Sequence, residues 1–280
     1  MVVMSVAIGE RRDGGEYVDI GGNPIWHLHT GNPAGPATVL LHSVFSTSAA
    51  WAAQILDFGD AGLDLYVPER IGHGHSPDVD GPYTFAGTAG QIITYLETVV
   101  GKPANLVGWG DSTCVALLVA QARPELVRKL VMTCGYINSD SVDLDEFLRP
   151  LARRDPILVD LLSELYQQFS PDGPRHFESY LAKAVDLMLP GPAYSTAEFA
   201  GVQAPALVVA SDTCGIDVGH GLELARTLPH GRFAVLPGTH LLPAESPELF
   251  NPLVLSFLAA DPPSDATYIN ELARSTHDDL

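Results

Sequence analysis

Short apolar runs alternate with longer amphipathic stretches along most of this chain, and this alternation limits the folds open to it. The runs with strand character are Tyr17–Ile20, Ile25–Thr30, Thr38–Leu41, Leu63–Pro68, Asn105–Gly108, Leu130–Thr133, Ala206–Ala210 and Phe233–Leu236. The stretches with helical spacing are Ala49–Leu56, Phe85–Val100, Ser112–Arg123, Glu223–Thr227 and Pro247–Leu258. Because parallel strands need helical crossovers, the pattern predicts an α/β fold, a mostly parallel sheet flanked by helices.

One long stretch interrupts the alternation. Between Gly135 and Ala204 the sequence shows helical spacing and no convincing strand. The expected helices are Leu144–Leu151, Ile157–Phe169, Phe177–Met188 and Ser195–Phe199. We therefore expect a helical lid over residues 137–203, inserted into a core of residues 1–136 and 204–280; such lids exclude water and shape a substrate pocket. The polar segment from Asp261 onward is expected to be a surface tail or terminal helix.

Charge narrows the range of partners. Among 280 residues, 34 are acidic and 15 basic, which gives a net charge of −19. Such a surface repels phosphate backbones and anionic membranes, so we expect no nucleic-acid or membrane partner and favour a small neutral or apolar substrate. No apolar run approaches the roughly 18 residues of a membrane span. A homodimer is compatible with the sequence, which leaves the oligomeric state open.

The cysteines and the N-terminus bear on location. Cys114, Cys134 and Cys214 are odd in number and widely spaced, which argues against a disulfide framework and for a reducing compartment. The first twelve residues lack the apolar stretch of a signal peptide. We therefore expect a cytoplasmic protein.

Four motifs occur in a suggestive order. They are LLHSV at residues 40–44, RIGHGHS at 70–76, GWGDST at 108–113 and GTHL at 238–241. Together they resemble the α/β-hydrolase family, in particular its members with a helical lid, over roughly residues 15–260. In that family the first motif forms an oxyanion loop, the third is the nucleophile elbow G-x-S-x-G, and the fourth carries the catalytic histidine. The resemblance implies the same fold and site here.

A glycine, Gly110, stands where the resemblance places the nucleophile. Pro124 follows it by fourteen residues, and the small Ala116 and Ala120 follow by six and ten, which matches the helix after the elbow. Ser112 is the alternative nucleophile, but it requires two deletions inside that helix and points about 200° away from the elbow position. Glycine relieves roughly 1–2 kcal/mol of strain at such a turn and removes the hydroxyl.

The resemblance also assigns a base and an acid. His240 is expected to be the general base, with a carboxylate at the end of the strand Ala206–Ala210 as its partner. Asp212 fits best, although the usual spacing of the family places the acid near Cys214; Asp217 and Asp140 are the alternatives. The acid would hold the imidazole tautomer and stabilise the imidazolium.

The oxyanion hole needs two backbone N–H groups, which the resemblance places at Val44 and Asp111. Ser43 stands where the family has a glycine, and Trp109 precedes Gly110; both are expected to border the substrate. A carboxylate at Asp111 is unfavourable beside an oxyanion unless it turns away or is protonated. As a helix N-terminal acid it would instead complement the helix dipole.

The other histidines, charged residues and tyrosines are weaker candidates for a catalytic or metal-binding role. The pairs His27 and His29, and His73 and His75, lack a third ligand with supporting spacing, so we expect no metal and no cofactor. Glu69 and Arg70 are expected to form a structural ion pair. The lid tyrosines could donate protons, but that role also needs an aspartate nucleophile at position 110, so they are expected to be pocket or surface residues. They are Tyr166, Tyr180 and Tyr194.

Three functions remain open on this evidence. The first is an enzyme whose His–Asp dyad acts as general base without a serine, in hydrolysis, C–C cleavage, cyclisation or cofactor-free oxygenation. The second is an inactivated form of a serine esterase, lactonase or C–C hydrolase in which Gly110 replaces serine. The third is a non-catalytic ligand-binding pseudo-hydrolase.

Overall fold

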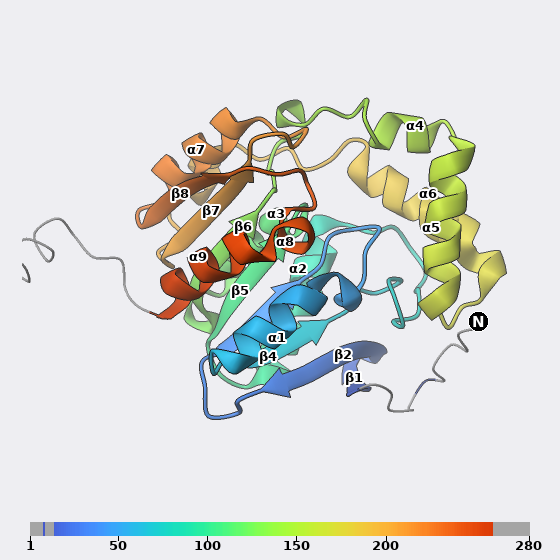
Figure 1. The fold of residues 1–280 in the computed structure, drawn as a ribbon. Helices are drawn as coiled ribbons and strands as arrows, with labels where there is room; N and C mark the ends of the chain where they lie inside the picture. The colour runs from blue at the N-terminus through green and yellow to red at the C-terminus, as the bar shows by residue number, and fades with distance from the viewer. Residues whose placement is uncertain (1–7, 9–13, 260–280) are drawn as a thin grey trace, which may run out of the picture.

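A single sheet organises the part of the chain that the structure, a computed structural model, describes: residue 8 and residues 14–259. Its eight strands lie in the order β1-β2-β4-β3-β5-β6-β7-β8 (Figure 1). They are β1 (Gly15–Ile20), β2 (Asn23–Gly31), β3 (Ala37–Leu41), β4 (Asp64–Pro68), β5 (Ala104–Trp109), β6 (Val127–Thr133), β7 (Ala206–Ser211) and β8 (Gly231–Leu236). β2 pairs antiparallel with β1 and β4, and the other neighbours are parallel. The predicted α/β fold is confirmed.

Helices cover both faces of the sheet. They are α1 (Ala52–Asp60), α2 (Phe85–Tyr95), α3 (Ser112–Ala122), α4 (Leu148–Ala152), α5 (Pro156–Phe169), α6 (Phe177–Met188), α7 (Val218–Thr227), α8 (Leu242–Glu245) and α9 (Pro247–Ala259). One apolar core joins the sheet to α2, α3 and α7, and a second joins it to α1, α8 and α9. Burial on both faces explains why the central strands read as continuous apolar runs.

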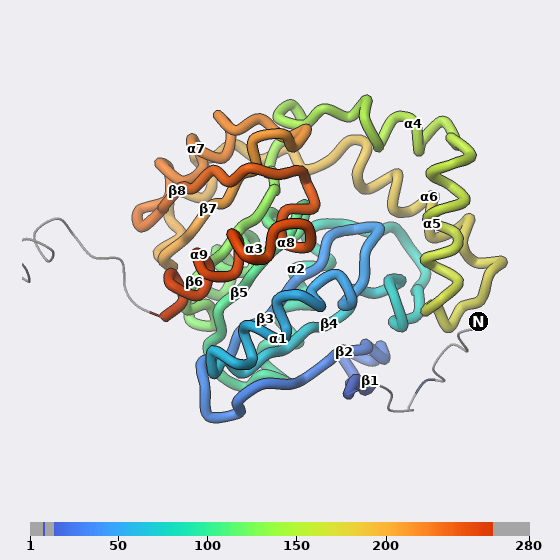
Figure 2. Tube along the Cα trace, viewed as in Figure 1, coloured from blue at the N-terminus to red at the C-terminus, as the bar shows by residue number. Residues whose placement is uncertain are grey.

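The predicted helices between β6 and β7 are present, and this part of the chain is called the helical insertion. It contains α4, α5, α6 and the short 3-10 helix Thr196–Phe199, with α5 and α6 at the opposite end of the molecule from α7 and β8 (Figures 1 and 2). The helix expected over Leu144–Leu151 begins only at Leu148, because Asp143 accepts a hydrogen bond from the Asp145 N–H in the preceding turn. The tail from Asp261 lies outside the described residues.

Asp78 anchors this insertion to the core. Its buried carboxylate accepts hydrogen bonds from Lys183 Nζ and His176 Nε2, both at 2.7 Å, and from the Tyr83 hydroxyl at 2.9 Å. Burial alone would raise the pKa of Asp78, but these hydrogen bonds outweigh it and lower the pKa below its usual value. Above that pKa, the ionised carboxylate stabilises the attachment.

Aromatic rings form a second contact between the insertion and the core. The Tyr180 ring meets those of Phe45 and His73 edge-on, with centroids 6.5 and 5.2 Å apart. Phe45 follows the HSV motif directly and has a left-handed backbone, with φ of 61°. The insertion therefore packs against the same loop that was predicted to hold an oxyanion donor.

Candidate active site

Gly110 lies at the sharp turn between the end of β5 and the start of α3. Its φ is +60°, a region that favours glycine. A Cβ on Gly110 would lie 2.7 Å from Ser43 Oγ and 3.2 Å from His240 Nε2. Position 110 therefore faces the imidazole, as a nucleophile position would.

Ser112 is engaged elsewhere. Its side chain is fully buried, and its Oγ donates to the His42 carbonyl at 2.7 Å and accepts from Arg70 Nη2 at 2.6 Å. The hydroxyl thus ties α3 to the loop after β3. This geometry favours Gly110 over Ser112 as the elbow position.

His240 contacts Trp109 through its backbone carbonyl and Cys214 through its imidazole. Trp109 Nε1 donates to the His240 carbonyl at 2.7 Å, so the residue before the elbow fixes the histidine loop. The imidazole Nε2 faces Gly110, and Nδ1 lies 3.5 Å from Cys214 Sγ. The partner of the imidazole in this structure is therefore a cysteine.

Asp212, the predicted partner, does not reach the imidazole. Its exposed carboxylate accepts from the Gly238 N–H at 2.9 Å. The backbone explains the difference, because the Asp212 and Thr213 N–H groups extend the β7–β8 pairing by donating to Leu236 and Gly238 carbonyls. The chain turns toward His240 only at Cys214, the position that the spacing of the family indicated.

The alternative acids also have other roles. Asp217 caps α7 by accepting from the Gly219 N–H at 2.9 Å. Asp140 lies in the short 3-10 helix Ser139–Ser141. Neither side chain forms a hydrogen bond with His240.

The Asp111 carboxylate accepts a hydrogen bond from the Val44 N–H, the group that was expected to bind an oxyanion. Its Oδ1 accepts from the Val44 N–H at 2.8 Å and from Ser43 Oγ at 2.9 Å, and its Oδ2 accepts from Arg70 Nη1 at 2.6 Å. Asp111 and Arg70 are both buried. In this structure the Val44 N–H is therefore satisfied by the protein's own carboxylate, and this network was not foreseen from the sequence.

Arg70 consequently pairs with Asp111, and the predicted ion pair with Glu69 is wrong. The buried Glu69 carboxylate accepts instead from the Ser48 hydroxyl at 2.7 Å and from the His75 N–H. The two side chains bind different partners, so adjacency in sequence did not indicate contact.

His42 fixes the shape of the loop that holds Ser43. Its Nε2 accepts from the Arg70 N–H at 3.1 Å, so Nδ1 carries the proton and donates to the Ser43 carbonyl at 2.8 Å. Burial, followed by the Arg70 charge, lowers the pKa of His42 well below its usual value. A neutral His42 is therefore a structural part of the site.

The remaining sequence candidates have other partners in the structure. His27 contacts Tyr95, and His29 contacts Asp64. Across the described residues no group of three or more His, Cys, Asp or Glu side chains could hold a metal ion. Tyr166 and Tyr180 stack in the insertion, and Tyr194 packs on Phe199. None of the helices in the described ranges is long and apolar enough to cross a membrane.

The chain belongs to the alpha/beta hydrolase family, whose sequence model matches residues 38–253. Lipase LipV of Mycobacterium tuberculosis is 29% identical over 107 residues, 38% of this chain and 40% of that protein. Pyrrolizixenacetamide deacetylase of Xenorhabdus hominickii is 26% identical over 141 residues, 49% and 53% of the two chains. The chain thus aligns with about half or less of the length of these relatives.

Solved structures share the fold. The enol-lactonase from Burkholderia xenovorans LB400 superposes with a TM-score of 0.71 at 19% identity, covering 87% of this chain and 100% of that chain. The meta-cleavage product hydrolase from Pseudomonas fluorescens IP01 has a TM-score of 0.71 at 17% identity, covering 88% and 97%. At this level of identity the likeness concerns the fold alone.

Proposed function

We propose that this protein is an enzyme that acts on a small, largely apolar substrate through His240, without a covalent serine intermediate. The observation that carries the proposal is the orientation of the imidazole, whose Nε2 faces the side of Gly110 from which a nucleophile would project. A substrate oxygen or a water bound there would be within reach of Nε2 for proton transfer. His240 would then act as general base on that water or on an acidic substrate proton.

The surroundings of Gly110 favour this chemistry over acyl transfer. An acyl-enzyme needs a nucleophilic hydroxyl and a free oxyanion hole, and each oxyanion donor contributes roughly 100- to 1000-fold to the rate. Here position 110 has no hydroxyl, and the Val44 N–H is bound to Asp111. Proton transfer by the imidazole requires neither group.

Ser43 argues against an inactivated serine enzyme. A serine at position 110 would place its Cβ 2.7 Å from Ser43 Oγ, which is fixed by its hydrogen bond to Asp111. Ser43 would have to move before the family nucleophile could be accommodated. Gly110 and Ser43 therefore fit one another as a pair.

The helical insertion supports a substrate with apolar character. Phe45, in the Ser43 loop, contacts both Phe147 and Tyr180 of the insertion. We infer that the insertion is the lid of the site and that it excludes water during the reaction.

A second candidate, a non-catalytic binder, is favoured by the occupied Val44 N–H, because a binder has no need of an oxyanion hole. Turnover of a panel of esters, lactones and β-diketones by the wild type, His240→Ala and the exposed-histidine control His230→Ala separates the two. Turnover that is lost only in His240→Ala supports the enzyme. Thermal stabilisation by panel compounds without turnover supports the binder, and equal turnover by all three proteins refutes the site.

A further inference from the structure

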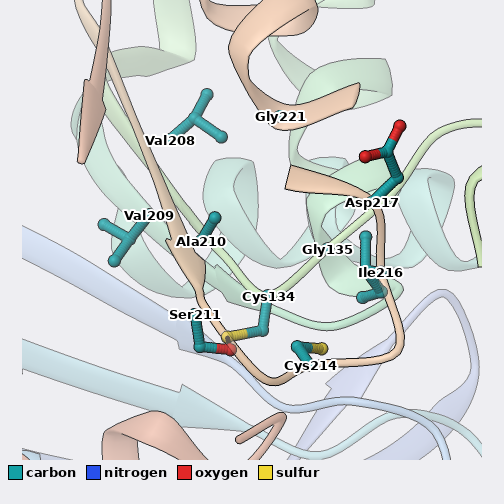
Figure 3. Close-up of a pocket in the computed structure, with 10 residues that line it drawn as sticks. All are labelled: Cys134, Gly135, Val208, Val209, Ala210, Ser211, Cys214, Ile216, Asp217 and Gly221. Atoms are coloured by element: carbon teal, nitrogen blue, oxygen red, sulfur yellow. Dashed lines mark hydrogen bonds between the residues drawn. The ribbon is translucent and has the colours of Figure 1, made fainter. Parts of the chain in front are cut away.

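Two cysteines lie beside the histidine loop. Cys134 directly follows β6, and its Sγ lies 3.3 Å from Ser211 Oγ and 3.8 Å from the Thr239 carbonyl. Cys214 follows β7, and its Sγ lies 3.5 Å from His240 Nδ1. Both side chains line one small cavity at the ends of these strands (Figure 3). The imidazole therefore faces Gly110 with Nε2 and the Cys214 thiol with Nδ1.

The three thiols of the chain, all within the described residues, differ in the direction of their pKa shifts. Hydrogen bonds, first from the Cys134 thiol and then from His240, lower the pKa of Cys214 to about 4 against the opposing effect of burial. The pKa of Cys134 is raised, first by its hydrogen bond with Cys214 and then by burial, and burial raises the pKa of Cys114. Cys214 is also the one that is half-buried, since Cys114 and Cys134 are buried.

Charge around the cavity restricts what can approach Cys214. Asp217 lines the cavity, and Asp143 and Glu146 lie beside the neighbouring Gly215. These carboxylates oppose the thiolate and repel anions, as does the net charge of −19. The other walls include the apolar Val209 and Ile216. An uncharged, small electrophile suits this setting best.

We propose that Cys214 is held as a thiolate that accepts a hydrogen bond from His240 Nδ1, and that this makes Cys214 a nucleophilic modification site for small uncharged α,β-unsaturated carbonyl compounds. The Sγ thiolate adds to the β-carbon, so that an S–C bond forms as the C=C π bond breaks. A proton from solvent water passes to the α-carbon and the buffer neutralises the hydroxide that is left, which balances the addition. His240 donates to the thiolate through Nδ1, and its Nε2 stays free for the proposed enzymatic reaction on the Gly110 side.

The test is the rate of acrylamide addition to the full-length protein, with the site identified by peptide mass spectrometry. An ordinary thiol with a pKa near 8.5 loses roughly 100-fold in rate between pH 8 and pH 6. We expect addition at Cys214 to change less than about threefold over that range, since the thiolate is already formed. A roughly 100-fold fall, or preferential addition at Cys114 or Cys134, would overturn the proposal.

Variants connect the reactivity to the histidine. His240→Ala should slow the pH 6 addition at least about tenfold, whereas the control His230→Ala should leave it unchanged. An unchanged rate in a folded His240→Ala protein would refute the pairing, and the wild-type pH profile tests the thiolate even if that variant does not fold. Because the readout is alkylation, a failure of the proposed enzymatic function would leave this result intact.

Discussion

Substituting Gly110 by serine tests how the elbow is built. The residue has φ of +60°, and a left-handed conformation costs a residue with a Cβ roughly 1–2 kcal/mol. The new Cβ would also lie 2.7 Å from Ser43 Oγ and displace it from Asp111. Loss of a hydrogen bond to a charged group costs roughly 1.5–3 kcal/mol. We therefore expect Gly110→Ser to lower the free energy of unfolding by roughly 2.5–5 kcal/mol.

Gly101 is a control that separates the conformational cost of a Cβ from the cost of its contact with Ser43. Gly101, after the π-helix Leu96–Val100, has φ of +66°, and a Cβ there would meet no atom of the described residues within 4 Å. Gly101→Ser should therefore cost only the conformational part, roughly 1–2 kcal/mol. In a Ser43→Gly background, Gly110→Ser should become about 2 kcal/mol less destabilising than in the wild type, because the contact with Ser43 has gone.

Urea denaturation followed by tryptophan fluorescence measures these differences, since Trp51 and Trp109 are buried. Gly110→Ala should behave like Gly110→Ser, because the effect arises at Cβ rather than at the hydroxyl. If the Gly110 and Ser43 substitutions are additive to within about 0.5 kcal/mol, the two residues are not coupled and the reasoning fails. The same conclusion follows if Gly110→Ser costs no more than Gly101→Ser.

The other predictions concern the surroundings of the site. Arg70→Met should lower the free energy of unfolding by roughly 3–5 kcal/mol in a urea titration, because it leaves the Asp111 carboxylate buried without its cation; a loss below 1 kcal/mol would show that the pair contributes little. The lowered pKa of Asp78 means that its stabilisation is present above the unfolded pKa near 3.9 and is lost as pH falls through the folded value. Hydrogen exchange should therefore show α5 and α6 loosening at acidic pH, and Asp78→Asn should give the same loosening at pH 7 and remove its pH dependence. Trp109→Phe removes the indole donor to the His240 carbonyl and should reduce stability by roughly 1 kcal/mol; unchanged stability in a urea titration would contradict this role.

Much of the fold could be read from the sequence because the strands are buried on both faces. Each expected strand is present, with ends that differ by up to three residues. The largest difference is in β6, which begins at Val127 although Arg128 and Lys129 follow. Lys129 is buried, and its Nζ donates to the Phe257 carbonyl. A charged side chain argues against a buried strand position, and the sequence pattern did not reveal this tertiary contact.

The start of α7 was likewise not predicted correctly from the sequence pattern. It was expected over Glu223–Thr227, but it begins five residues earlier, at Val218. Asp217 caps it, while Gly219 and Gly221 in its first turns have low helix propensity. The cap and the packing of α7 against β7 and β8 outweigh that propensity.

The site was less accessible to sequence reasoning. The elbow position followed from the resemblance of the GWGDST motif to the elbow of the family, and the spacing along the next helix set its register. The partner of His240 did not, because two extra backbone hydrogen bonds between β7 and β8 decide whether Asp212 or Cys214 reaches the imidazole. Likewise, the Asp111 side chain binds Val44 and Arg70, which are distant in sequence.

The central claim is that His240 acts without a covalent intermediate. Acid-quenched intact-mass spectrometry during steady-state turnover of the ester, lactone and β-diketone panel tests it most directly, with His240→Ala as the comparison. We predict turnover by the wild type with its mass unchanged at every time point, and no turnover by His240→Ala. A substrate-derived adduct that forms and decays at the rate of turnover, or turnover that persists without the imidazole, would contradict the account.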